Sequence, residues 1–252
     1  MLLLVGTGVS YNDISMAAVE ACRGCELYVE RYTSFVGSQK VEYLEKILGK
    51  RITALSREDL EEKAKETVAM ADAKDIAILV GGDPLTATTH KILMIEARKQ
   101  GIKTRILHSS SVIPTVIGES GLDFYRFGQV CTIPRWTERY KPVSFYDTIE
   151  RNLSRNLHSL VLLDYDGQNE RTLPVKDAVA ALAAAENEYG KGIIGKSTVM
   201  MLVQDVGTGE QRVALTSMGE APTQDKGRMT TLIIPAKLSE IEEEAMRSMA
   251  VT

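Results

Sequence analysis

The sequence predicts an α/β protein built from two α/β domains. Along most of its 252 residues, short apolar runs alternate with segments whose apolar residues recur at helical spacing. The clearest unit spans residues 76–101, where the unbroken run IAILV meets GGDP at residues 81–84 and a helical pattern follows. Such a run is typical of a parallel strand covered by helices on both faces. The alternation restarts near residues 109–115, so we place an N-terminal domain with this GDP loop at residues 1–110 and a C-terminal domain at residues 111–252.

In the N-terminal half, strands and helices are expected to alternate. Asp13 is suited to cap the helix that follows the first strand. Ser56 and Asp59, in the stretch SRED, predict a variant of the capping box for a later helix. Gly101 is suited to end the helix that starts at Thr86. The predicted strands are residues 1–5, 26–30, 51–55, 76–80 and 103–108, and the predicted helices are residues 13–23, 38–48, 56–73, 86–101 and 112–119.

The C-terminal half repeats this alternation and ends in several strands and a helix. Its predicted strands are residues 129–133, 159–164, 198–204, 212–217 and 230–235, and its predicted helices are residues 144–155, 175–189 and 239–249. Between them, residues 134–142 (PRWTERYKP) are charged, carry the single Trp and are bounded by prolines. We interpret this stretch as a mobile loop beside a site, although a plain surface connection explains it nearly as well.

Composition narrows the classes of function. The chain is 44% hydrophobic and 25% charged, which is typical of a globular protein with a substantial core. The net charge of −4 argues against a protein whose main task is to hold nucleic-acid phosphates. No apolar run approaches the ~20 residues that span a bilayer, and MLLLVGTGVS lacks the basic start of a signal peptide. We therefore expect a cytoplasmic protein without a membrane or nucleic-acid partner.

The GDP loop is the first candidate for a binding site. Gly81 and Gly82 allow a ligand to approach the backbone, Asp83 offers an acceptor, and the threonines of TATTH add hydroxyls. Ligands of open α/β sheets bind beyond the carboxyl ends of the strands. A strand-to-helix turn also favours Gly, Asp and Pro for structural reasons alone. The density of polar groups favours a small polar ligand with hydroxyls or an amine.

Two other glycine patterns are poor nucleotide sites. Gly6 and Gly8 begin a dinucleotide fingerprint, but Tyr11 stands in place of its third glycine. Residues 190–197 (GKGIIGKS) fit the phosphate-loop pattern. A predicted helix precedes them and a strand follows, which reverses the order that a phosphate loop needs. We therefore do not expect an NTPase.

The sequence also argues against a metal site. Cys22 and Cys25 form a C-x-x-C within a helical pattern, without a second pair of cysteines or spaced histidines. The three histidines, His90, His108 and His158, do not stand at metal-ligand spacing. A lone His near a strand end is more often a packing or hydrogen-bonding residue.

Several blocks of the sequence carry a family resemblance. LLLVGTGV and GGDPLTATTH are similar to motifs that recur among tetrapyrrole methylases. ERYTS and SFYDTIERNLSRNLHSLVLLD are narrower, and through them the chain resembles the diphthine synthases, which are S-adenosylmethionine-dependent methyltransferases. The resemblance implies a tetrapyrrole-methylase-like fold in which two α/β domains have a cofactor cleft between them. The matching blocks are residues 2–9, 30–34, 55–61, 81–90, 121–134 and 144–164.

The resemblance also implies which residues line the site of S-adenosylmethionine. No covalent nucleophile is implied, because the sulfonium of the cofactor carries the reactivity, and the catalytic residues stay unknown. No metal is implied either. The implied cofactor-binding residues are Val9, Asp83, Thr86, Ser111, Val112, Leu163, Gln204 and Thr230.

The activity that the resemblance implies belongs to diphthamide biosynthesis. A homodimer would transfer methyl groups to the amine of a 3-amino-3-carboxypropyl group on one histidine of translation elongation factor 2. Arg31, Arg57 and Arg135 are candidates for holding the substrate carboxylate, because guanidinium groups suit carboxylates. The proline-bounded loop would offer Trp136 and Tyr140 to this protein substrate. Two alternatives stay open: methylation of a cobalamin precursor, which is a tetrapyrrole, by the same fold, and a nucleotide-binding module without catalysis.

Overall fold

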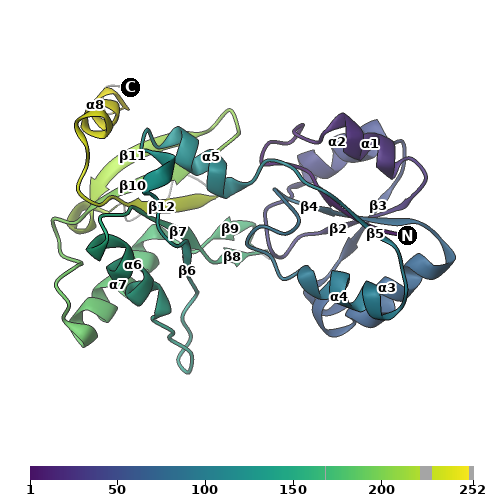
Figure 1. Cartoon of the computed structure of the whole chain (residues 1–252), viewed down its shortest axis with the longest axis horizontal. Coiled ribbons are helices and arrows are strands. Elements are labelled where there is room, and N and C mark those ends of the chain that lie inside the picture. The colour runs from purple at the N-terminus through teal and green to yellow at the C-terminus, as the bar shows by residue number, and fades with distance from the viewer. Residues whose placement is uncertain (168, 222–228, 250–252) are drawn as a thin grey trace. The chain divides into compact units, whose positions relative to one another are not determined.

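Figure 1 shows the computed structural model, which describes residues 1–167, 169–221 and 229–249. The chain forms two compact units, and each is treated by itself below. Unit 1 consists of Met1–Val112 with Gly167–Glu170, and unit 2 consists of Ile113–Asp166 with Arg171–Thr252.

Unit 1 is built on a five-stranded parallel sheet. Its strands are β1 Leu2–Gly6, β2 Glu26–Glu30, β3 Ile52–Leu55, β4 Ile76–Val80 and β5 Thr104–Leu107. Their order is β3-β2-β4-β1-β5, and each neighbouring pair is parallel. Every residue of β1 and β4 is buried. The apolar runs at the start of the chain and before the GDP loop are therefore central strands, as predicted.

Helices cover both faces of this sheet (Figure 1). They are α1 Met16–Cys22, α2 Ser38–Leu48, α3 Ala64–Ala73 and α4 Lys91–Lys99, with a π-helical turn, η1 Glu58–Glu62, before α3. Successive side chains of a strand point to opposite faces. Leu3 and Val5 of β1 accordingly pack in one core with α1 and α2, whereas Leu2 and Leu4 pack in another with α3 and α4.

Unit 2 is built on a five-stranded mixed sheet. Its strands are β6 Cys131–Ile133, β7 Ser159–Leu163, β10 Val199–Gln204, β11 Arg212–Ser217 and β12 Thr230–Ile234. Their order is β11-β10-β12-β7-β6, in which only β6 and β7 pair in parallel among these neighbours. A separate hairpin, β8 Tyr165–Asp166 and β9 Arg171–Thr172, was not predicted, because two-residue strands are too short to show a period.

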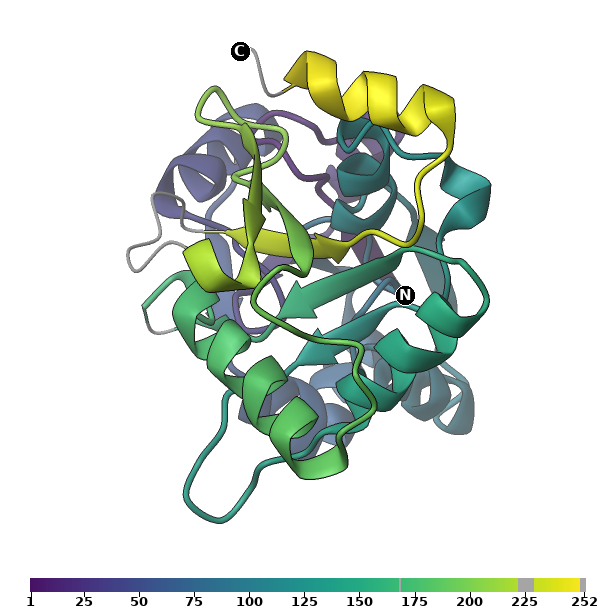
Figure 2. The ribbon, with the colours of Figure 1, turned by 90° about the vertical axis from the view of Figure 1, so that its left-hand side faces the viewer.

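The helices of unit 2 are α5 Val112–Glu119, α6 Ser144–Ser154, α7 Val175–Tyr189 and α8 Glu240–Met249, with short 3₁₀ turns η2 Phe124–Arg126 and η3 Met218–Glu220. Figures 1 and 2 show α6 and α7 on the same side of the sheet. Phe145, Tyr146 and Ile149 of α6 form the core there with Leu182 of α7 and Leu232 of β12.

The first helix begins later than predicted. Ser15 caps it, since the Ser15 hydroxyl accepts the N–H of Ala18 (3.2 Å), and α1 starts at Met16. Asp13 instead accepts the N–H of Val9 (3.2 Å). The prediction that Asp13 caps this helix is therefore wrong, and its carboxylate belongs to the loop before the helix.

The helix after the GDP loop also starts late. It was predicted from Thr86 but begins at Lys91. Ala87 has a φ of 55°, in the left-handed region, and His90 Nδ1 lies 3.1 Å from the Pro84 carbonyl oxygen. These local features hold residues 84–90 in turns.

The capping box at the start of η1 is confirmed. The Ser56 hydroxyl accepts the N–H of Asp59 (3.2 Å), and the Asp59 carboxylate accepts the N–H of Ser56 (2.8 Å). Within the described residues, no helix combines the length and the apolar character needed to cross a membrane.

Candidate functional site

Two glycine loops meet at the carboxyl ends of β1 and β4. Gly8 donates its N–H to the Gly82 carbonyl oxygen (3.2 Å), and Gly82 donates its N–H to the Gly8 carbonyl oxygen (2.9 Å). Their φ angles are 72° and 69°, a region that glycine enters without strain. The Thr7 hydroxyl adds a bond to the Val80 carbonyl oxygen (2.9 Å). The two glycine patterns, far apart in the sequence, thus form one structure.

Asp83 organises the second loop from within, because its side chain is buried. One carboxylate oxygen accepts the Leu85 N–H (3.0 Å) and the Thr86 hydroxyl (3.1 Å). The other lies 2.7 Å from His108 Nδ1 and 3.3 Å from the Ser109 nitrogen. Burial alone would raise the pKa of Asp83, but these hydrogen bonds outweigh it and hold the pKa below its usual value. Asp83 therefore stays charged and ties the loop after β4 to the loop after β5.

The loop after β1 meets the loop after β5 at Val9. The Val9 N–H lies 3.2 Å from both the Asp13 carboxylate and the Ser110 hydroxyl. The Ser110 hydroxyl also donates to this carboxylate. Ser111 is buried next to it, and Val112 begins α5. The structure thus brings the five predicted residues of unit 1 to one edge of the sheet, beyond the adjacent strands β4, β1 and β5.

The loop after β2 joins this edge through residues absent from the predicted set. The fully buried Glu30 accepts the N–H groups of Tyr32 and Thr33, both at 3.0 Å. The Ser34 hydroxyl donates to the Gly81 carbonyl oxygen (3.1 Å). ERYTS therefore folds around its own Glu and attaches to the GDP loop through its Ser. A carboxylate that ends a buried strand, followed by hydroxyl residues, was the available sequence signal.

The three predicted residues of unit 2 lie at one edge of its sheet. Gln204 ends β10 and pairs in register with Thr230, the first residue of β12. The Gln204 amide donates to the Thr230 hydroxyl (3.2 Å), and both side chains are buried. Leu163 ends β7, the other neighbour of β12. The Thr230 N–H donates to the Thr172 hydroxyl (3.0 Å), so Thr172 is a buried polar residue of this edge that the motifs did not indicate.

A carboxylate of the protein itself accepts backbone N–H groups of the phosphate-loop pattern GKGIIGKS. Glu186, near the end of α7, accepts the N–H groups of Gly192 (2.6 Å), Ile193 (2.9 Å) and Ile194 (2.8 Å). The Tyr146 hydroxyl donates to the same carboxylate (2.9 Å). Burial opposes its charge, but the backbone donors keep the pKa of Glu186 lowered. These are amides that a phosphate would need, so the pattern has a structural role.

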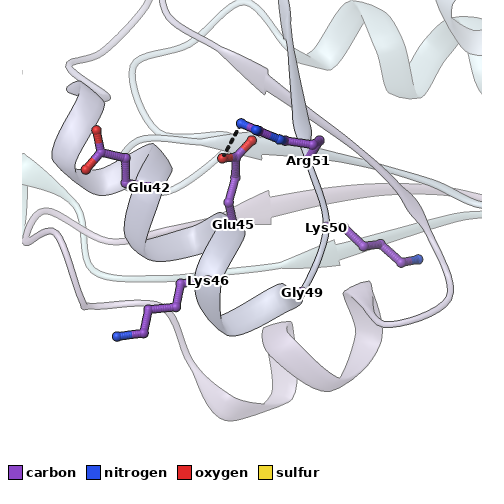
Figure 3. A pocket seen from close by; sticks show the side chains of 6 residues that line it. All are labelled: Glu42, Glu45, Lys46, Gly49, Lys50 and Arg51. Atoms are coloured by element: carbon purple, nitrogen blue, oxygen red, sulfur yellow. Dashed lines mark hydrogen bonds and ion pairs between the residues drawn. The ribbon is translucent and has the colours of Figure 1, made fainter.

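Three other groups of residues are less suited to a site. Figure 3 shows a surface hollow at the end of α2, where Glu45 and Arg51 point toward one another, 3.5 Å apart. Its charges are of both signs, and none belongs to the predicted set. Burial raises the pKa of Cys22 to about 12, which leaves this thiol unreactive. Among the described residues, no group of three or more His, Cys, Asp or Glu side chains could hold a metal ion.

The three arginines considered for the substrate carboxylate already have carboxylate partners. Arg31 pairs with Glu170, Arg57 lies 2.7 Å from Glu61, and Arg135 lies 3.8 Å from Asp166. Because a guanidinium has several N–H donors, each of these arginines can bind a second carboxylate beside its partner, and the role of the arginines stays a prediction.

The proline-bounded loop, residues 134–142, is closed by its own hydrogen bonds. Trp136 Nε1 donates to the Pro142 carbonyl oxygen (3.2 Å), and the Thr137 N–H donates to the Tyr140 carbonyl oxygen (3.0 Å). Trp136 packs against the core of unit 2, whereas Tyr140 is 62% exposed. Trp136 therefore anchors the loop, and Tyr140 is the aromatic residue that the loop presents to solvent.

The chain is similar to known proteins along most of its length. The profile of the family Tetrapyrrole (Corrin/Porphyrin) Methylases matches residues 1–222. A diphthine synthase of Methanothermobacter thermautotrophicus is 34% identical over 99% of this chain and 96% of its own length. A diphthine methyl ester synthase of Yarrowia lipolytica is 35% identical over 90% of this chain and 81% of its own length.

Solved structures give the same result. A crystal structure of diphthine synthase superimposes with a TM-score of 0.84 at 33% identity, over 99% of this chain and 96% of the other. A conserved hypothetical protein of Aeropyrum pernix K1 superimposes with a TM-score of 0.90 at 32% identity, over 100% of this chain and 90% of the other.

Proposed function

The chain belongs to the tetrapyrrole (corrin/porphyrin) methylase family, and from this premise we propose that it methylates the amine of the 3-amino-3-carboxypropyl-modified histidine of translation elongation factor 2. It is an S-adenosylmethionine-dependent methyltransferase, and its activity is that of a diphthine synthase in diphthamide biosynthesis. The observation that carries the proposal is the joined pair of glycine loops at the carboxyl edge of unit 1, in a chain similar to diphthine synthases along nearly its whole length.

The residues of unit 1 fit S-adenosylmethionine in charge and access. The cofactor carries a positive sulfonium and an amine, and the carboxylates of Asp13 and Asp83 lie in the two glycine loops. A Cβ added at Gly82 would meet no atom nearer than 3.8 Å, so the backbone is open there. We assign cofactor binding to the eight residues Val9, Asp83, Thr86, Ser111, Val112, Leu163, Gln204 and Thr230.

The chemistry places few demands on the side chains. The bound cofactor supplies an activated methyl group for in-line displacement. The protein must hold the acceptor nitrogen in line with the methyl group and keep it unprotonated, because its lone pair forms the new bond. The buried Asp83 contributes by fixing the backbone of the loop, since its oxygens are already bonded to the protein.

The decisive experiment supplies labelled S-adenosylmethionine and elongation factor 2 in two forms, one with the aminocarboxypropyl histidine and one unmodified. Label is expected only in the modified form, and mass spectrometry should place it on that residue. Equal labelling of both forms, or of neither, would contradict the proposed substrate.

The same experiment distinguishes two acceptor atoms. A relative from Yarrowia lipolytica is a diphthine methyl ester synthase, which makes the substrate carboxylate a second candidate acceptor. Mild alkali removes a methyl ester and leaves an N-methyl group. Loss of all label in alkali would therefore show that the carboxylate, and not the amine, accepts the methyl group.

Further reactions test the two alternatives that the sequence left open. Label on a cobalamin precursor, with none on elongation factor 2, would assign the tetrapyrrole as acceptor. Tight binding of ATP without methyl transfer to either substrate would indicate a nucleotide-binding module.

We also propose that the protein is a homodimer that acts in the cytoplasm, where its translation factor is found. Light scattering tests the dimer: a particle of 27.7 kDa at every concentration would contradict it.

A further inference from the structure

Lys40 on α2 is a charged residue in an unusual position. The residue is only 5% exposed, and its ammonium group donates to the Gly8 carbonyl oxygen at 2.6 Å. Lysine side chains normally keep the ammonium group in water, and burying it costs free energy unless specific contacts offset the cost. The contact that this lysine makes lies in the first glycine loop.

The Gly8 carbonyl oxygen is a junction between three segments. Besides Lys40, it accepts the N–H of Gly82 at 2.9 Å, while Gly8 donates its own N–H back to Gly82. A hydrogen bond from a charged donor is stronger than one between neutral groups. Lys40 thus attaches α2 to the point where the loops after β1 and β4 are joined.

A second contact from α2 bears on the same loop. Tyr43 lies about one turn after Lys40 and meets Tyr11 edge to face, with ring centroids 5.5 Å apart and an interplanar angle of 86°. Tyr11 is the residue that replaces the third glycine of the dinucleotide fingerprint. In this chain, α2 therefore contacts the loop at two positions, through Lys40 and through Tyr43.

We propose that Lys40 is a positioning residue for S-adenosylmethionine: by binding the Gly8 carbonyl, it fixes the loop in which the next residue, Val9, is assigned to the cofactor. The inference rests on the proposed function, because it requires the cofactor at this loop. Lys40 acts through the Gly8 backbone.

The charges around Lys40 make this role dependent on pH. Burial lowers the pKa of Lys40 to about 8, although the carboxylate of Asp13, which faces it from the loop after β1, favours the protonated form. The GDP loop faces it with the Gly82 backbone, and Tyr43 of α2 contacts Tyr11 in the loop after β1. Above about pH 8 the amine loses its charge and becomes a weaker donor to Gly8.

The test measures the affinity for S-adenosylmethionine by calorimetry in the wild type, Lys40→Met and Lys46→Met. Near neutral pH, Lys40→Met should bind roughly tenfold more weakly, since a charge-assisted hydrogen bond to the loop is lost. Lys46 is exposed on the same helix, so Lys46→Met should bind as the wild type does. Thermal unfolding should show that Lys40→Met loses little stability, because Met fills the space and the Gly8 carbonyl oxygen keeps its hydrogen bond from the Gly82 N–H. A residue with a purely structural role would lower stability and affinity together.

The pH profile gives an independent readout. The amine of the cofactor itself titrates in this range, at roughly 8 for an α-amino group, so the comparison is the difference between the two proteins. The advantage of the wild type over Lys40→Met should shrink as the pH rises through about 8. Lys40→Arg stays charged, so its affinity should keep its advantage over Lys40→Met at higher pH. If Lys40→Met does not fold, the pH profile of the wild type is compared with that of Lys40→Arg instead.

The outcomes separate the two hypotheses. Equal affinity and equal pH profiles in the wild type and Lys40→Met would overturn the role of Lys40 and leave the proposed function intact. No binding of S-adenosylmethionine by the folded wild type would overturn the proposed function instead.

Discussion

His158 Nε2 donates to the Glu242 carboxylate at 2.9 Å, and both side chains are almost completely withdrawn from water. The tautomer follows from the other ring nitrogen, because His158 Nδ1 accepts the N–H of Ala236 (3.0 Å). The carboxylate also accepts from the Arg126 guanidinium and from the N–H of Ser239 (2.8 Å). Glu242 thus joins the start of α8 to two other segments. One is η2, which contains Arg126, and the other precedes β7 and contains His158.

Glu242→Gln should destabilise unit 2. Removing the charge leaves the Arg126 guanidinium without its buried partner, and breaking a buried ion pair typically costs about 3 to 5 kcal/mol. Unfolding in urea measures the change. Glu243→Gln is the matched control, because Glu243 is exposed on the same helix and pairs with the exposed Arg247. Equal unfolding midpoints for the two variants would show that the buried network contributes no more than a surface pair.

The same network predicts a loss of stability in acid. Although burial opposes it, the N–H of Ser239 and the ring of His158 lower the pKa of Glu242 to about 2, from an ordinary value of 4.5. Its stabilising effect is therefore complete above about pH 4.5 and is lost as the pH falls toward 2. Burial also lowers the pKa of His158 from 6.5, so the unfolded chain takes up a proton below that pH before the folded chain does, which adds to the loss.

Unfolding in urea at a series of pH values tests this prediction. The free energy of unfolding should fall steadily below about pH 6.5, and Glu242→Gln should lose the part of the decrease that lies below 4.5. Parallel curves for the two proteins in that lower range would contradict the assignment to Glu242.

Asp83→Asn should weaken binding of S-adenosylmethionine with little effect on the sheet. Its carboxylate accepts from Leu85, Thr86 and the ring of His108, and hydrogen bonds to a charged acceptor contribute about 1.5 to 3 kcal/mol. This corresponds to roughly 10- to 100-fold in affinity, measured by calorimetry. Asp72→Asn, on the exposed side of α3, provides the control and should bind normally. Unchanged affinity in Asp83→Asn would remove Asp83 from the site.

Glu186→Gln should destabilise the loop after α7 and should not create an NTPase. The amide of Gln replaces a charged acceptor of three backbone N–H groups by a weaker one, at a cost of roughly 1 to 2 kcal/mol. Glu188→Gln, at a neighbouring exposed position of α7, is the control. Tight ATP binding by the wild type would mean that a phosphate displaces Glu186, which the present geometry does not predict.

The sequence predicted the strands well because burial on both faces leaves a simple pattern. β4 and β1 are continuous apolar runs, and the capping box at Ser56 is a local pair of residues. The contacts between the loops at the carboxyl ends of the unit 1 strands were harder to predict. Asp13 and Ser110 meet only because β1 and β5 are neighbours in the sheet, and no local pattern shows this.

Lys40 is another residue whose contact with the loop after β1 no local pattern shows. Its place on α2 follows from helical spacing, but its contact with Gly8 depends on how α2 packs against the sheet. Motif matching also gave no indication of Thr172, because the hairpin that carries it is too short to show a period. Lys40 and Thr172 were missed because tertiary contacts hold them, whereas the capping box at Ser56 was found because its two residues are close in the sequence.

Gly167–Glu170 belongs to unit 1, although it lies between two segments of unit 2 in the sequence. Unit 1 is therefore completed late during synthesis. All five strands of unit 1 are translated before β6, so its sheet can assemble early. Glu170, which pairs with Arg31 in the ERYTS loop, is translated only after α6 and β7. The ion pair between Arg31 and Glu170 can therefore form only after part of unit 2 has been translated.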